Sequence, residues 1–237
     1  MNSTATDGAS SPLILHPDST VVLPPRLFAP PLYYAAMACH GRAVVDTAVR
    51  YDKRRKEVHR YDIADVRGPL ALTVPVQRPH TISAAAPTWA DAAVSDHGQW
   101  WHVHRVTLES AYGRTPYFEF VADRFASVIA PPGSEPPSVL ELARRADTAV
   151  RDFLGIDTCV EWRPAAALAA PADAESPIPG RIIDLRRASF SSADMPPYFQ
   201  VRAAALGFIP SLSILDLIFN LGPEAPLYLR RMAETNF

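Results

Sequence analysis

Glycine and lysine are scarce in this chain of 237 residues, which holds ten glycines and only two lysines, Lys53 and Lys56. None of the motifs GxGxxG, GxxxxGKS/T or GxSxG occurs. These motifs bring backbone N–H groups to a phosphate or expose a nucleophilic serine, so their absence argues against Rossmann, P-loop and α/β-hydrolase chemistry. With so few glycines, a glycine-rich phosphate cradle of another kind is excluded as well.

Cysteine and long apolar runs are also rare. Cys39 and Cys159 lie far apart in apolar surroundings, so we expect two buried thiols in a reducing compartment rather than a disulfide framework. No run approaches the roughly 18–20 apolar residues of a membrane helix. The N-terminal stretch lacks the basic segment and apolar core of a secretory signal. We therefore expect a cytoplasmic protein without stable membrane insertion and with a disordered tail over residues 1–19.

The charge balance gives no overall attraction to nucleic acid or anionic membranes, because the net charge is −2 and the pI about 6.4. A hydrophobic fraction of 48% is ordinary for a globular protein with a substantial core. The stretch 165–180, rich in alanine and proline, is the one plausible domain boundary. The segments on either side of it are too small to fold alone, so we predict a single domain over residues 20–237.

Alternating strand and helix patterns predict an α/β fold with a central, mostly parallel sheet and helices packed on it. A β-branched run at 20–23, a short helix between Pro30-Pro31 and Gly41, and a second strand at 43–46 form a βαβ unit. Further strands are predicted at 70–76 and 158–162, and helices at 100–112, 117–129, 138–154 and 213–222. The last helix is apolar almost all round and should be buried.

The helix that starts at Trp100 has an unusual face. Trp100, His104, Leu108 and Tyr112 recur every four residues, and Pro116 enforces the end of the helix. The two aromatic residues suit either core packing or stacking on a sugar or base. His104 is the best acid–base candidate, because an ordinary histidine pKa of about 6.5 suits proton transfer. The alternative is a histidine that is hydrogen-bonded within the core.

The run 51–60, YDKRRKEVHR, is the densest cluster of charge. It is either a solvated loop or an anion site in which the guanidinium groups of Arg54, Arg55 and Arg60 clamp a phosphate. Acidic residues interspersed within the run argue against a nucleic-acid patch.

Seven histidines raise the question of a metal site. His102 and His104 are close in sequence, but on a helix they point about 200° apart. No HExxH or CxxC spacing occurs, so we expect no metal site, and the sequence indicates no cofactor.

Asp216 follows Ser213 with the spacing of a capping box, which alone would explain it. A buried carboxylate that faces a cleft is the alternative.

Five segments spread over about residues 20–230 together carry a resemblance to a known family. In chain order they are Phe28–Tyr34 (FAPPLYY), Tyr51 with His59–Ile63 (HRYDI), Leu72–Val76 (LTVPV), Trp100–Phe118 (W-x3-H-x3-L-x3-Y-x3-PYF), and Tyr198–Gln200 with Gly207–Asn220. The set resembles the WbqC-like protein family. There are two departures: His59 stands where asparagine is usual, and the glutamine that often accompanies the first proline turn is absent. A ligand contact that relatives make through that glutamine would be missing here.

The resemblance implies a bacterial protein associated with the assembly of surface polysaccharide such as O-antigen, without a settled reaction. Our first hypothesis is a group-transfer enzyme that moves an acyl or aminoacyl unit to a nucleotide-activated or lipid-linked sugar. The roles in it are phosphate binding for Arg60 and Arg54, general base for His104, sugar contacts for Trp100 and Tyr112, and a ligand position at the end of a central strand for Asp46.

Two other hypotheses stay open at this point. One is a non-catalytic binding or scaffold protein of the same pathway, which predicts a flat, exposed apolar patch near 223–237 and no enclosed polar cleft. The other is an RNA or DNA binder that uses residues 50–60. We expect a small sugar compound rather than nucleic acid as the partner, and the sequence leaves the oligomeric state open.

Overall fold

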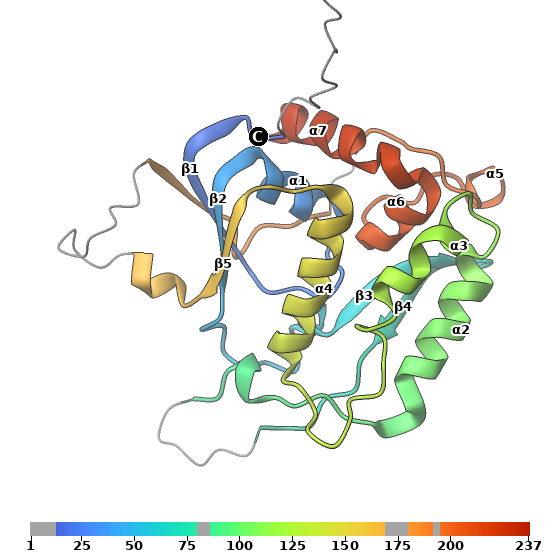
Figure 1. The fold of residues 1–237 in the computed structure, drawn as a ribbon, viewed down its shortest axis with the longest axis horizontal. Helices are drawn as coiled ribbons and strands as arrows, with labels where there is room; N and C mark the ends of the chain where they lie inside the picture. The colour runs from blue at the N-terminus through green and yellow to red at the C-terminus, as the bar shows by residue number, and fades with distance from the viewer. Residues whose placement is uncertain (1–12, 80–85, 169–179, 192–194) are drawn as a thin grey trace, which may run out of the picture.

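A computed structural model describes residues 13–79, 86–168, 180–191 and 195–237 (Figure 1). At its centre is a four-stranded sheet of β1 (His16–Leu23), β2 (His40–Asp46), β5 (Cys159–Arg163) and β6 (Arg181–Asp184). All neighbouring strands are parallel, in the order β5-β2-β1-β6. The predicted α/β fold with a mostly parallel central sheet is therefore confirmed.

The βαβ unit at the start of the chain forms as predicted. Pro31 begins α1 (Pro31–Cys39), where its missing N–H costs no hydrogen bond, and all nine helix residues are buried. β1 begins at His16 rather than at residue 20, because His16 already pairs with His40 of β2. In Figure 1 α1 and α4 (Val139–Leu154) lie on the same side of the sheet and cover its core face.

The two ends of α4 follow directly from the sequence. Ser138 caps the helix by accepting a hydrogen bond from the Glu141 backbone N–H at 3.1 Å. Gly155 ends it with φ +62°, a left-handed conformation that favours glycine. The buried stripe includes Leu142, Ala146 and Val150, so the helix is amphipathic as predicted.

A second layer lies on the other side of α4 from the sheet (Figure 1). It consists of an antiparallel hairpin, β3 (Arg60–Asp65) and β4 (Gly68–Thr73), with α2 (Trp100–Tyr112) packed beside β3. The sequence patterns do not predict β3, because it follows the charged run directly. β4 ends at Thr73 rather than at residue 76, before Pro75, which cannot donate to a ladder.

One predicted helix is wrong in part. Residues 117–129 form only the short α3 (Phe118–Val121) followed by a 3-10 turn over Ala122–Phe125. Val121 has φ −123°, outside the helical range, so the α-helix ends there. Val121 and Phe125 are nevertheless both buried, as their four-residue spacing predicts.

The C-terminal part contains α5 (Ala203–Leu206), α6 (Ile214–Leu221) and α7 (Ala225–Asn236). α6 is buried as predicted, with seven of its eight residues inaccessible to solvent. α7, which the sequence patterns do not predict, lies along α1 (Figure 1) and buries one face against it. The apolar patch expected near 223–237 is therefore reduced to two exposed large side chains, Leu227 and Phe237.

The two cysteines differ in environment. Cys39 is buried in α1, whereas Cys159 is exposed at the start of β5, an edge strand of the sheet. The expectation of two buried thiols is therefore wrong for Cys159. No helix in the described ranges is long and apolar enough to cross a membrane.

Replacement of Leu229 by alanine should lower the free energy of unfolding by about 2–5 kcal/mol, because this fully buried side chain fills the contact between α7 and the core. Leu227→Ala is the matched control: Leu227 is 64% exposed on the same helix, so the change should stay within about 0.5 kcal/mol. Urea denaturation followed by circular dichroism measures both. Equal effects of the two substitutions would contradict the docking of α7.

Candidate functional site

Three segments far apart in the sequence meet at the carboxyl end of β1. They are the loop 26–30 between β1 and α1, residues 57–62 at the start of β3, and the loop 211–213 before α6. Together they line a cavity of about 150 Å³. In open α/β sheets, ligands usually bind beyond the carboxyl ends of the strands, at the point where the strand order reverses. Here the chain proceeds from β1 to β2 on one side and returns as β6 on the other.

Backbone hydrogen bonds join these segments in pairs. The Leu27 N–H donates to the Glu57 carbonyl at 3.3 Å, and the Ile214 N–H donates to the Ala29 carbonyl at 2.9 Å. The third bond runs from the Ser213 N–H to the carbonyl of Asp62 at 2.8 Å. The main chain alone therefore fixes the walls of the cavity.

Two residues at the cavity have strained backbone conformations. Phe28 has φ +43° and Ser211 has φ +65°, values that cost a non-glycine residue roughly 1–2 kcal/mol each. Burial fixes Phe28, whose ring contacts that of Tyr61 with centroids 5.0 Å apart, and the Ser211 hydroxyl donates to Ser191 at 3.0 Å. Strain of this kind tends to gather at functional sites.

Four charged side chains line the cavity: Arg26, Glu57, Arg60 and Asp62. Nε of Arg60 donates to the hydroxyl of Thr73, its cross-strand partner on β4, at 2.7 Å, which holds the guanidinium beside that strand. Nε of Arg26 is buried without a partner among the described residues, and burial lowers the pKa of this side chain. Partial desolvation raises the pKa of Asp62, while neighbouring Arg60 opposes the shift. The site therefore combines cationic and anionic groups.

His104 lies behind this cavity rather than in it. Its side chain is 3% exposed, and Nδ1 is 3.1 Å from the hydroxyl of Tyr61, which does line the cavity. Burial lowers the pKa of His104 to about 4, so the ring is neutral at pH 7. This geometry favours the core histidine that the sequence left as an alternative, with Tyr61 between the imidazole and any ligand.

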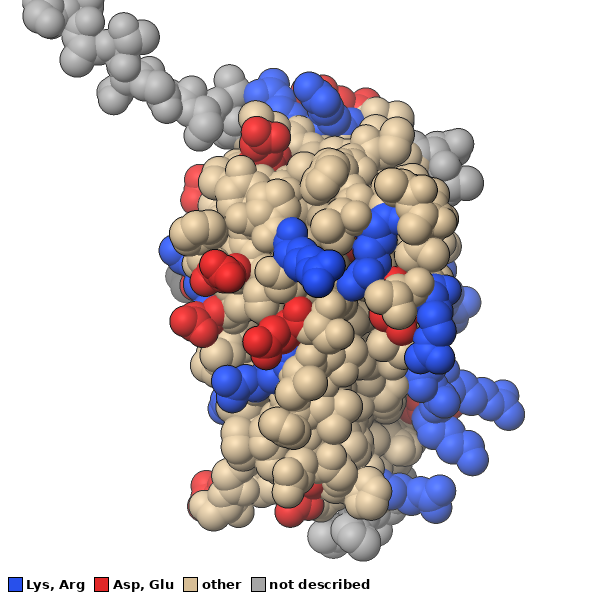
Figure 2. Space-filling model, turned by 90° about the vertical axis from the view of Figure 1, so that its right-hand side faces the viewer, with Lys and Arg blue, Asp and Glu red and all other residues tan. Residues whose placement is uncertain are grey.

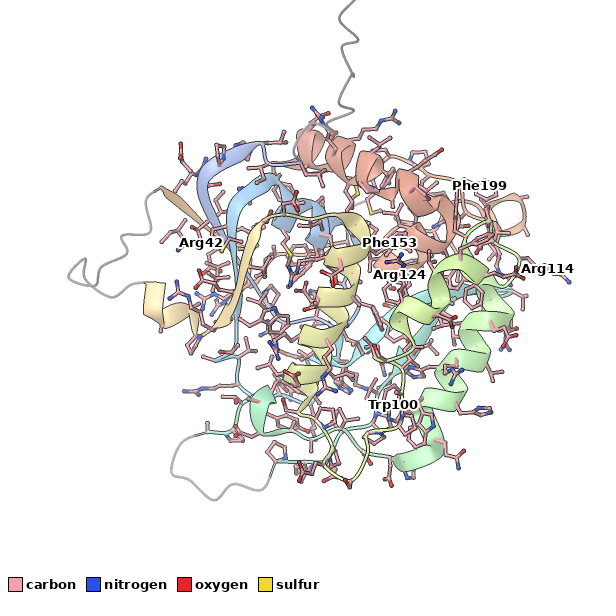
Figure 3. The ribbon with its side chains drawn as sticks, in the orientation of Figure 1. Arg42, Trp100, Arg114, Arg124, Phe153 and Phe199 are labelled. Carbon is pink, nitrogen blue, oxygen red and sulfur yellow. The ribbon has the colours of Figure 1, made fainter. Side chains whose placement is uncertain are left out.

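The two aromatic candidates on α2 do not line the cavity either. Trp100 stands at the amino-terminal end of α2 (Figure 3), where its indole N–H donates to the Ser95 carbonyl at 2.9 Å. Tyr112 is buried, and its hydroxyl accepts a hydrogen bond from the Ala64 N–H at 3.1 Å. Both side chains hold the helix in place instead of framing a sugar at this site.

Asp216 forms the centre of a buried polar network. Its carboxylate accepts hydrogen bonds from the Tyr198 hydroxyl at 2.6 Å and from Nε2 of Gln200 at 3.0 Å, and it contacts Tyr112. The Ser213 N–H donates to the backbone carbonyl of Asp62 and is therefore not available to the Asp216 carboxylate. Only the serine half of the predicted capping box forms, in which the Ser213 hydroxyl accepts from the Leu215 N–H. Desolvation raises the pKa of Asp216. The carboxylate is buried, as one alternative held, but it does not line the cavity at β1.

Asp46 has a role in joining strand ends. Oδ1 accepts hydrogen bonds from the N–H groups of Ala48 and Ala165, each at 3.0 Å, and Oδ2 pairs with Arg186 at 2.9 Å. Asp46 therefore connects β2 to the segments that follow β5 and β6.

Arg54 is exposed in a turn and does not line the cavity. Of the six residues selected from the sequence, only Arg60 lines it; the other five are Asp46, Arg54, Trp100, His104 and Tyr112.

Sequence reasoning missed Arg26, Asp62 and Ser211. Arg26 could have been found, because it follows the first predicted strand at the edge where α/β sheets bind ligands. Asp62 could have been found from its spacing of two from Arg60, which places both on one face of a strand. Ser211 carries no such signal, since its position depends on how α6 packs.

Charge elsewhere is more dispersed. On the α2 side of the molecule most of the surface is uncharged, with basic and acidic residues both present (Figure 2). Val103 and Val106 of α2 are each 50% exposed. Among the described residues, no group of three or more His, Cys, Asp or Glu side chains is placed to hold a metal ion.

The fold and cavity thus define an α/β protein with a small cavity, lined in part by charged residues, at the end of its first strand. The sequence matches the WbqC-like protein family over residues 25–188, and the chain belongs to this family. The matched region contains the loop 26–30 and β3 but ends before the loop 211–213.

One relative is an uncharacterized protein, Rv1507c, of Mycobacterium tuberculosis (strain ATCC 25618 / H37Rv). It is 27% identical over 213 residues, which cover 79% of this chain and 89% of that protein. No solved structure matches the chain.

Burial of His104 should appear in the pH dependence of stability. As the pH falls below about 6.5, the unfolded chain takes up a proton on this histidine, whereas the folded state does so only near pH 4. Between pH 7 and 4, the free energy of unfolding should therefore decrease by up to about 3 kcal/mol more in the wild type than in His104→Gln. Urea denaturation at a series of pH values measures this difference.

The matched control is His102→Gln, an exposed position on the same helix, which should follow the wild type over the whole pH range. A constant difference between the wild type and His104→Gln would show that His104 is not held neutral in the core.

Proposed function

We propose that the protein is a group-transfer enzyme that attaches an acyl or aminoacyl unit to a nucleotide-activated or lipid-linked sugar in the assembly of bacterial surface polysaccharide. The observation that carries this proposal is the cavity at the end of β1, where two arginines and two carboxylates converge from separate segments. The family resemblance supplies the polysaccharide context, and the cavity supplies a place for the charged end of a substrate.

The roles proposed for individual residues follow from their positions. Arg60 and Arg26 hold an anionic group, because charge-assisted hydrogen bonds from guanidinium groups suit carboxylates and phosphates. Asp62, at the mouth of the cavity, takes the proton-accepting role first considered for His104. His104 orients Tyr61 through their hydrogen bond and so acts as a positioning residue.

A non-catalytic binding or scaffold role is the second candidate. It is favoured by exposed apolar side chains, namely Phe120 at 78% exposure together with Val103 and Val106 on α2. An interaction surface of this kind would bind a partner without using the charged cavity.

A thermal-shift screen with sugar nucleotides, acyl donors and small anions tests the first proposal. A ligand bound only by the folded state raises the melting temperature by mass action. Arg60→Gln should weaken the binding of the active compound about tenfold or more, because a hydrogen bond to a charged group is lost.

Arg54→Gln is the control, because Arg54 belongs to the same basic run but is exposed outside the cavity. The proposal fails if Arg54→Gln abolishes the shift and Arg60→Gln leaves it intact.

A further inference from the structure

We infer that the cavity at the end of β1 binds a small zwitterion, the α-amino and α-carboxylate groups of a small amino acid. Arg60 and Arg26 contact the carboxylate, and Asp62 contacts the ammonium group. This inference rests on the proposed function, because it assigns a substrate class to the same cavity. The free amino acid is held there through its two charges, and no transfer step is assigned to its unactivated carboxylate.

The charge of the lining is balanced. Two arginines face two carboxylates, Glu57 and Asp62, so the formal charges cancel. Glu57 is already paired with Arg55 at 3.5 Å, whereas no ion pair is formed by Arg26, Arg60 or Asp62 among the residues that the structure describes. The two cations and one anion available to a ligand match a molecule with both signs of charge.

The spacing of these groups suits a short ligand. Arg60 and Asp62 lie two positions apart on β3, so their side chains leave the same face of the strand with about 7 Å between their Cα atoms. The Arg60 charge acts on the Asp62 carboxylate, so the two groups are within electrostatic reach of each other. An amino acid can place its carboxylate at Arg60 and its ammonium group at Asp62, whereas a phosphate offers nothing to that carboxylate.

The size of the cavity restricts the ligand further. At 150 Å³ it is smaller than the roughly 300–1,000 Å³ of sites that enclose drug-sized molecules. A small amino acid suits a cavity of this size, while a whole sugar nucleotide would extend out of it.

The donors around the cavity differ in how accessible they are. Nε of Arg26 is sealed from solvent without a partner among the described residues, so a ligand in the cavity would contact this arginine through its terminal guanidinium nitrogens. Ser213 also belongs to the lining, and its hydroxyl accepts from the Leu215 N–H at 3.0 Å, so its own proton remains to be donated.

Isothermal titration calorimetry of the full chain with matched probes tests the inference. The probes are glycine and L-alanine, which carry both charges, propionate with only the carboxylate, ethylamine with only the ammonium group, and inorganic phosphate. We expect L-alanine or glycine to bind at least about tenfold more tightly than propionate, ethylamine or phosphate, because each of these lacks one of the two charged contacts.

Two variants identify the contacts. Asp62→Asn should remove the preference for L-alanine over propionate, whereas Arg60→Gln should weaken both compounds. Asp62 is exposed at the mouth, so its variant should retain the wild-type melting temperature without ligand. Arg60→Lys is the control for Arg60→Gln: both variants lose the Nε contact with Thr73, but only the lysine variant keeps the positive charge.

The outcomes separate this inference from the proposed function. If phosphate or propionate binds more tightly than either amino acid and still depends on Arg60, the amino-acid inference is overturned and the proposed function stands. If no probe binds in a manner that depends on Arg60, while sugar nucleotides still bind through it, the inference again fails alone. If neither class of compound depends on Arg60, both are overturned.

Discussion

The structure depends on three backbone hydrogen bonds that join the loop after β1, the start of β3 and the loop before α6. Buried backbone groups must be paired, so these bonds join the three segments through the main chain. Side-chain contacts add to this frame, since Phe28 packs on Tyr61 and the Ser211 hydroxyl donates to Ser191. Arg26, Arg60 and Asp62 can present charge to a ligand because the main chain has already positioned them.

The polar groups behind the cavity differ in character from those that line it. His104 and Asp216 are almost completely buried, and desolvation shifts the pKa of each toward its neutral form. Each is satisfied by tyrosine hydroxyls, His104 by Tyr61 and Asp216 by Tyr198. A layer of buried, hydrogen-bonded polar groups therefore supports the fold apart from the charged groups of the cavity, and both of these buried side chains have hydrogen-bond partners in the core.

Family membership and geometry contribute different information about function. The family match covers two of the three segments that form the cavity, but the loop 211–213 lies beyond residue 188. The relative in Mycobacterium tuberculosis carries no described activity. The chemistry proposed here therefore rests on the charges and size of the cavity, and the link to polysaccharide assembly rests on the resemblance.

The sequence by itself determined the elements whose signals are local. Helices could be predicted because their signals act within a few residues of the chain. These signals are the proline at the start of α1, Ser138 and Gly155 at the ends of α4, the four-residue spacing of α2 and the apolar composition of α6. Arg60 could be selected from the sequence because it belongs to a dense basic run, which is also a local signal. Only the tertiary structure decided which candidates share a site, because the cavity is assembled from segments some 150 positions apart. One face of α2 carries Trp100, His104 and Tyr112, and the sequence made this face a candidate site. In the structure that face packs into the core. The reason is the hydrophobic effect, which favours the burial of aromatic side chains whatever chemistry they could perform.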